Sequence, residues 1–341
     1  MKEEKRRIQL TGGSTYTISL PIKWARDAGI KQGDELSILQ RSDNSLLLSP
    51  VRQREGELKC AELELSRTES FEDNFRYLIA QYLIGADIVK LLSPSGFEAE
   101  ERRRIKEEVR NRLIGMEVVG ESSREIVLKS FLKYEDFTLH DAIQSMSRII
   151  MAMLDDAIYA LEHSDKNRAK DIVERDNEID RFYLLIVRQL KAAVSDPELA
   201  KKIEVGRPRD SLGFRIIVKS MERMGDHIEN IAKHDQLLSA PVGAAKIKEI
   251  GMRTKALFAK TLDSLATRDI LKANEAIRDA NLLIDRVKEL NEQFLAEEWS
   301  TTDKIHALSI VESIDRIAKY CQDIAEITIN LGMKEPGETE C

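Results

Sequence analysis

Hydrophobic residues recur at alternating three- and four-residue intervals through the C-terminal half of the chain. The two clearest stripes are Ile143, Met146, Ile150, Met153, Ala157 and Ile217, Met221, Met224, Ile228, Ile231. This spacing places apolar side chains on one face of a helix, so each stripe predicts a helix packed in a bundle. Breaks rich in Pro, Gly, Ser and Asp divide residues 136–333 into six predicted helices.

These six helices repeat as two sets of three. Residues 176–180 align with 281–285, and residues 221–225 align with 314–318. An internal duplication therefore predicts two three-helix units, 136–238 and 239–333, that pack as elongated bundles. The last residues, 334–341, are expected to form a flexible tail.

The first 54 residues show a two-residue alternation instead. Residues 16–20 alternate and stop at Pro21, a short helix follows over 22–28, and 35–39 with 45–49 predict a hairpin across 42–44. The resulting β-β-α-β-β unit, 1–54, is too short to bury an adequate core alone. We therefore expect it to fold as an intertwined homodimer.

The segment 55–135 has mixed patterning in the order strand, helix, strand, helix, strand, strand. This order predicts a small α/β connector domain. No Gly-rich turn in it is followed by the Lys-Ser/Thr pair of a phosphate loop. The pattern assigns no chemistry to the connector.

Composition narrows the class of protein. The 341 residues are 42% hydrophobic and 33% charged, with 7 Pro and 16 Gly, which excludes a collagen-like or mostly disordered chain. Three widely separated cysteines argue against a disulfide framework. No signal peptide or membrane-spanning run is evident, so we expect a cytoplasmic protein.

Charge is distributed unevenly along the chain. Residues 1–54 hold ten Lys or Arg and six Asp or Glu, a net charge of +4, which leaves −11 for 55–341 when the whole chain carries −7. A basic N-terminal segment followed by an acidic remainder allows an anionic partner for the N-terminal segment only.

Three strings of the N-terminal segment, 7–14, 18–21 and 28–36, resemble the AbrB/SpoVT/MazE family of swapped-hairpin DNA-binding domains. The resemblance implies a dimeric β-barrel that presents basic side chains to duplex DNA, whose phosphates set the affinity. The candidate DNA-binding residues are Arg6, Arg7, Lys23 and Arg26. The alternative is a dimerisation module with ordinary surface charges.

Four acidic residues of the C-terminal half share one spacing. Asp176 and Asp180 are four residues apart on one predicted helix, and Glu222 and Asp226 are four apart on the next. If the helices are antiparallel neighbours, the four carboxylates converge and repel one another unless a cation neutralises them. Carboxylate-rich sites suit hard cations, iron or manganese.

The alternative is a solvated acidic face, or one paired with Arg175 and Arg223. The string 221–233, with 174–180 before it, resembles the signature of the PhoU family of phosphate-uptake regulators, over about 136–333. That resemblance implies a metal site at the four acids. We expect about one divalent or trivalent ion per chain, iron, zinc, manganese or magnesium.

The second repeat departs from the acidic pattern. Asn281 replaces the first acid and leaves Asp285, while Lys319 stands where Asp226 would align, four residues after Asp315. A lysine ammonium can replace a bound cation by pairing with Asp285 and Asp315. We therefore expect the second repeat to be charge-compensated internally.

Together these features predict a multidomain protein: a swapped-hairpin β-barrel dimerisation unit, a small α/β connector and an all-α pair of duplicated three-helix bundles. The resemblances imply a DNA-binding regulator of phosphate uptake. A second reading is an interaction scaffold that docks on a phosphate transporter ATPase or a sensor histidine kinase. A metal-dependent hydrolase is a third, but the sequence holds no Gly-x-Ser-x-Gly or His-Glu-x-x-His motif, and we expect no enzyme.

Overall fold

The computed structural model describes residues 4–40, 45–50 and 58–334, and the chain separates into two compact units, 1–57 and 58–341. The predicted hairpin turn at 42–44, the predicted boundary near residue 54 and all but the first residue of the predicted tail lie outside the described residues. Each unit is described by itself below.

The first unit has the predicted β-β-α-β-β order. Strands β1 (Gln9–Thr11) and β2 (Thr15–Thr17) form an antiparallel hairpin, as do β3 (Leu36–Gln40) and β4 (Leu46–Pro50). Helix α1 (Ile22–Asp27) lies between the hairpins and begins after Pro21. Gly12 and Gly13 turn the first hairpin at φ +63° and +81°, a conformation that L side chains rarely adopt.

Apolar side chains of this unit face outward. None of its described residues is buried. The large apolar residues that leave more than half of their surface exposed are Ile8, Leu10, Tyr16, Ile18, Ile22, Ile38 and Leu46. A unit of this size that exposes its apolar positions lacks the burial needed to fold alone.

The connector forms one four-stranded sheet with two helices. Its elements are β5 (Cys60–Glu64), α2 (Phe71–Leu83), β6 (Ile88–Leu92), α3 (Ala99–Arg112), β7 (Met116–Glu121) and β8 (Glu125–Ser130). The strand order is β5-β6-β8-β7, with β5 and β6 parallel and the other pairs antiparallel. The sheet and both helices enclose a core that includes Leu78, Tyr82 and Leu128.

The helical part contains the six predicted long helices. They are α4 (Leu139–His163), α5 (Lys166–Ser195), α7 (Asp210–Asp235), α8 (Ala244–Thr267), α9 (Ile270–Ala296) and α10 (Thr301–Gly332). A short helix that the pattern did not predict, α6 (Pro197–Lys202), begins at a proline after the capping carboxylate of Asp196. One continuous apolar core runs through both repeats. Across the described residues, no helix has the length and apolar character that crossing a bilayer requires.

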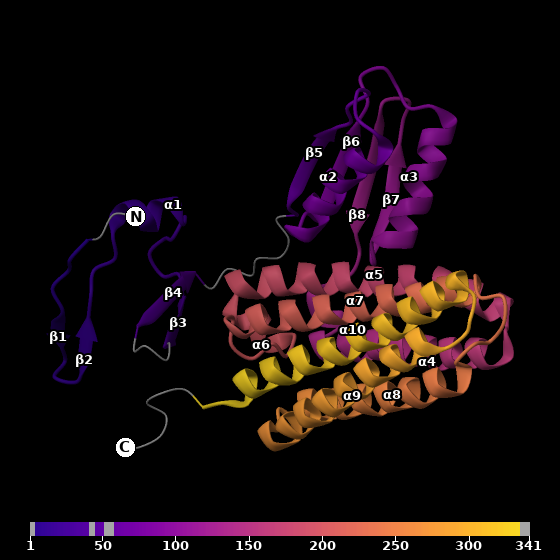
Figure 1. Ribbon diagram of the computed structural model, residues 1–341. Helices are drawn as coiled ribbons and strands as arrows, with labels where there is room; N and C mark the ends of the chain where they lie inside the picture. The colour runs from indigo at the N-terminus through magenta and orange to yellow at the C-terminus, as the bar shows by residue number, and fades with distance from the viewer. Residues whose placement is uncertain (1–3, 41–44, 51–57, 335–341) are drawn as a thin grey trace. The chain divides into compact units, whose positions relative to one another are not determined.

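A buried arginine joins the connector to the bundle. Arg188 of α5 is 4% exposed and donates hydrogen bonds to the carbonyl oxygens of Tyr82 and Ala86, at 2.5 and 3.0 Å. Figure 1 shows the connector standing on α5, the helix that carries two of the predicted acids. The connector therefore contacts the same helix as the candidate metal site.

Candidate functional site

The four predicted acids lie along the packed pair α5 and α7. Asp176 and Asp180 come from α5, and Glu222 and Asp226 come from α7. The helices approach closely at Gly225, where an added Cβ would lie 2.7 Å from Asp176 Oδ1. The glycine thus lets the α5 carboxylate sit directly against the backbone of α7.

Burial raises the pKa of all four carboxyls, and repulsion by other members of the set adds to it for Asp176, Asp180 and Glu222. Burial first, then the charges of Asp180, Asp226, Glu229 and Glu222, raise the pKa of Asp176 to about 7. Burial and the charge of Asp226 raise the pKa of Asp180. Burial also raises the pKa values of Glu222 and Asp226. The acids of α5 and α7 therefore lie near enough for their charges to act on one another across the two helices.

Positive charge reaches the four acids mainly from α7 itself: Lys219 lowers the pKa of Asp180, Glu222 and Asp226, and His227 and Arg223 lower that of Asp226. Among the four acids, within the described residues, Glu222 forms an ion pair, and its partner is Lys219, one helical turn earlier. The other Glu222 oxygen, Oε2, is buried and has no hydrogen-bond partner there. Arg175 is turned away and pairs instead with Asp156 at 2.7 Å, so that arginine does not neutralise the cluster.

The donor set fits a hard cation by its chemistry. Carboxylate oxygens are the ligands that such ions prefer, and an unpartnered Glu222 oxygen among mutually repelling acids is a place where a cation would stabilise the fold. As the side chains stand, the described part of the chain holds no group of three His, Cys, Asp or Glu residues arranged to bind a metal. The metal site therefore stays a prediction on these four residues.

One acid of this cluster was not predicted. The charge of Glu229, on α7, raises the pKa of Asp176 and also acts on Asp180 and Asp226. Glu229 follows Asp226 by three residues, which places it on the same helix face. That spacing is the sequence signal that identifies it.

The second repeat supplies its own cation. Lys319 Nζ lies 2.5 Å from Asp315 Oδ2, as expected. Asp285 pairs with Lys288 at 2.9 Å rather than with Lys319. Asp285 and Asp315 are thus each paired with a lysine three or four residues along their own helix.

The predicted DNA-binding residues are all exposed. Arg6 and Arg7 immediately precede the first hairpin, and Lys23 and Arg26 are three residues apart on α1, on one face of that helix. Arg6 forms an ion pair with Glu4 at 2.5 Å. Their exposure leaves these side chains accessible to a polyanion.

The duplicated three-helix bundle, with an acidic pair on each of two adjacent helices of its first repeat, defines a class of helical-bundle protein. The PhoU domain family matches residues 143–234 and 247–328, more than half of the chain, and the chain belongs to the PhoU family. The family described as antidote-toxin recognition MazE, bacterial antitoxin, matches residues 9–56. Both family resemblances inferred from the sequence are confirmed.

Curated relatives align with the helical part. The phosphate-specific transport system accessory protein PhoU homolog of Clostridium acetobutylicum is 26% identical over 202 residues, which cover 57% of this chain and 90% of that protein. The PhoU accessory protein of Escherichia coli K12 is 22% identical over 208 residues, 55% of this chain and 80% of its own length.

A solved structure has the same helical fold. The phosphate transport system regulatory protein PhoU from Streptococcus pneumoniae superposes with a TM-score of 0.50 at 20% identity, over 57% of this chain and 94% of that chain. Members of this family are accessory and regulatory proteins, and the chain is not an enzyme. The hydrolase reading is therefore excluded.

Proposed function

We propose that the protein regulates phosphate uptake in the cytoplasm and controls transcription through a DNA-binding N-terminal unit. The observation that carries this proposal is the presence, in one chain, of two PhoU repeats and a MazE-type domain. Relatives matched over the helical part are accessory proteins of phosphate transport, which supports the same process here. A DNA-binding unit attached to such a module supports a transcriptional output.

A second copy of the chain supplies the surface that the N-terminal unit needs in order to fold. None of that unit's described residues is buried, so apolar side chains such as Leu10, Tyr16 and Ile38 need a partner surface. Association of two copies buries these side chains and doubles the set Arg6, Arg7, Lys23 and Arg26. Paired basic surfaces of this kind suit the two-fold symmetry of duplex operators.

The proposed regulatory signal is the binding of a cation at the four acids. Binding would relieve the repulsion between Asp176, Asp180, Glu222 and Asp226 and draw α5 and α7 together at this point. A residue of the connector, Arg112, acts on this acidic site. Arg112, at the end of α3, lies 3.4 Å from Glu72, and its charge lowers the pKa of Asp180.

Salt-dependent DNA binding tests the proposal. Fluorescence anisotropy would follow the full-length protein on a labelled promoter fragment of the operon that contains its gene. We expect affinity to fall steeply with salt, with a log–log slope of about −0.9 for each phosphate neutralised. Changing Arg6, Arg7, Lys23 and Arg26 to Ala should weaken binding and flatten that slope.

A matched control removes the same charge elsewhere. Arg76, Arg103, Arg253 and Lys288 are exposed residues of the second unit, and their change to Ala should leave DNA binding unaltered. Equal binding by both quadruple variants, or retention that salt does not alter, would rule out DNA binding by the N-terminal unit.

The second candidate function is a scaffold that does not bind DNA. The name of the relatives, accessory proteins of a transport system, favours docking on a phosphate transporter ATPase or a sensor histidine kinase. In that case the N-terminal unit serves only for assembly. Co-purification of such a partner with the Arg6, Arg7, Lys23 and Arg26 variant, together with absent DNA binding, would support this function.

A further inference from the structure

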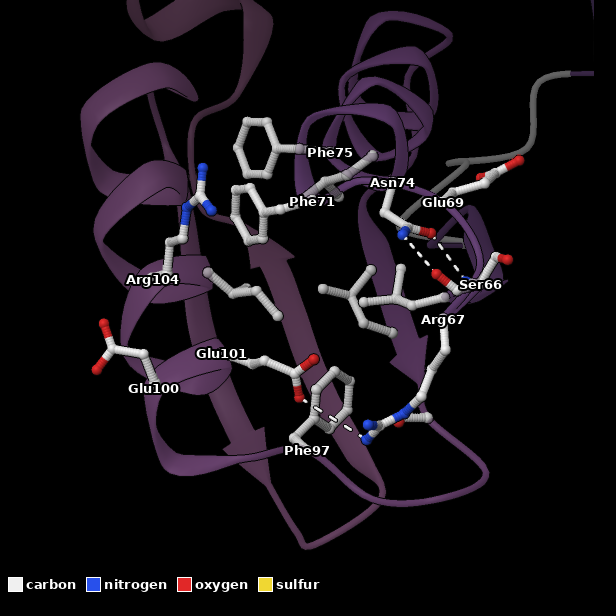
Figure 2. A pocket seen from close by; sticks show the side chains of 15 residues that line it. Ser66, Arg67, Glu69, Phe71, Asn74, Phe75, Phe97, Glu100, Glu101 and Arg104 are labelled. Carbon is white, nitrogen blue, oxygen red and sulfur yellow. Dashed lines mark hydrogen bonds and ion pairs between the residues drawn. The ribbon is translucent and has the colours of Figure 1, made fainter.

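The connector contains a pocket at the carboxyl ends of its parallel strands. Leu65, Ser66 and Arg67 follow β5, and Ser93 follows β6, at the edge where α2 and α3 begin (Figure 2). The cavity has a volume of about 280 Å³. The crevice outside the carboxyl ends of parallel strands is where open α/β sheets commonly hold ligands.

The pocket is lined in part by polar residues, among them Glu69, Glu100 and Glu101, but most of its walls are apolar. The apolar walls are formed by Phe71, Phe75, Leu78, Leu91, Phe97 and Ile105. All but Phe71 are buried. Figure 2 shows Phe71 and Phe75 on one side of the space and Phe97 on the other. Such a surface favours an apolar body, aromatic or branched aliphatic, and disfavours a small ion that must be desolvated completely.

Arg67 provides positive charge at the rim. Its guanidinium donates one hydrogen bond, to the Gly96 carbonyl at 2.5 Å, and its side chain is 48% exposed. The nearest carboxylates, of Glu98 and Glu101, lie 4.0 and 3.9 Å away, outside hydrogen-bond distance. Figure 2 shows Arg67 and Glu101 turned toward each other beside Phe97. The remaining N–H groups of Arg67 make no hydrogen bond within the described residues.

The other arginine of the pocket is already engaged. Arg104 lies 3.8 Å from the centroid of the Phe71 ring and pairs with Glu72 at 3.1 Å. It therefore acts as a support for the wall. Arg67 has N–H groups that can donate to a ligand in the pocket. Its planar guanidinium can form two parallel hydrogen bonds with a carboxylate.

We propose that this pocket binds a small apolar carboxylate, with the apolar body among the phenylalanines and the carboxylate on Arg67. The volume lies just below the usual range of ligand pockets, which limits the ligand to a single ring or a short branched chain. The contact between Arg67 and Glu101 opens at little cost because it is long and exposed. The site does not depend on DNA or metal binding elsewhere in the chain.

Calorimetry and ligand-observed NMR on the full-length protein test the site. The probes are phenylacetate and 4-methylpentanoate, compared with benzyl alcohol, which lacks the carboxylate, and with inorganic phosphate, which lacks the apolar body. We expect saturable binding of one or both carboxylates and none of the two comparison compounds. Binding of benzyl alcohol as tight as that of phenylacetate, or absence of carboxylate binding at the solubility limit, would overturn the proposal.

Variants locate the binding. Arg67→Gln should weaken carboxylate binding about tenfold, since it removes the charge-assisted pair. Arg76→Gln, a control on an exposed arginine of α2 outside the pocket, should bind as the wild type does. Leu65→Phe adds bulk to a residue that lines the pocket and should also weaken binding, which keeps the test valid if Arg67→Gln folds poorly. Unchanged binding in both pocket variants would contradict the assignment.

Discussion

Lys319 Nζ lies 2.5 Å from Asp315 Oδ2 in the second repeat, at the position where the first repeat carries Asp226. The two repeats therefore differ in how the negative charge of their acids is compensated. One repeat places a lysine beside its acid, whereas the other gathers four carboxylates with raised pKa values and one lysine pair. This asymmetry is why cation binding is assigned to the first repeat alone.

Metal content should follow this asymmetry. Protein purified without chelator should retain about one ion per chain, measured by plasma mass spectrometry. Asp226→Ala should abolish it, because it removes a carboxylate from α7, while Asp315→Ala should leave it intact. Loss of metal in both variants, or in neither, would contradict a site confined to the first repeat.

Stability of the metal-free protein should decrease as the pH rises. Asp176 has a folded-state pKa of about 7, against an ordinary value of 3.8. Between these values the folded state binds more protons than the unfolded state, so the free energy of unfolding falls with rising pH. Denaturant titrations in chelator should show this decline between pH 4 and pH 7.

Asp176→Asn should remove part of that decline, because Asp180, Glu222, Asp226 and Asp235 also have raised pKa values. The variant should be more stable than the wild type at pH 8 by about 1–2 kcal/mol, after allowance for screening by water. Asp263→Asn, an exposed acid on α8, controls for the change in net charge. A wild-type protein whose stability is the same throughout the window would contradict the raised pKa of Asp176 and hence its burial beside the other acids.

The close approach of α5 and α7 depends on Gly225. An added Cβ would lie 2.6 Å from Ile179 Cδ1 and 2.7 Å from Asp176 Oδ1. Gly225→Ala should therefore destabilise the protein by about 1–3 kcal/mol in denaturant titrations. Gly120→Ala in β7, where the nearest atoms would be 3.8 Å away, should have little effect. Equal stability of the two variants would mean that the helices are not in contact at Gly225.

Arg188 should hold the connector on the bundle. Replacing it by Met removes the arginine donor from the Ala86 carbonyl and one of the donors of the Tyr82 carbonyl, which still accepts from the Gly85 N–H, at a cost of about 1–3 kcal/mol. Limited proteolysis should then release the connector faster than in the wild type. Lys191→Met, on an exposed position of the same helix, is the control. If the two variants are cleaved at the same rate, Arg188 is not the anchor.

Periodicity explains how much of the fold the sequence predicts. The three-four spacing identifies the six long helices because each buries one stripe, and the i, i+4 carboxylates identify the acidic site because helix geometry fixes their face. The short helix α6 was missed because six residues carry too little periodicity. Arg188 and the connector pocket were also missed, because burial of an arginine and the meeting of β5 with β6 are set by tertiary packing.

The most direct test of the central claim is chromatin immunoprecipitation of the full-length protein from phosphate-replete and phosphate-starved cells. The account predicts enrichment at promoters of phosphate-uptake genes that differs between the two conditions and disappears when Arg6, Arg7, Lys23 and Arg26 are changed to Ala. Enrichment no higher than that of the quadruple variant, in both conditions, would contradict a regulator that joins phosphate control to DNA.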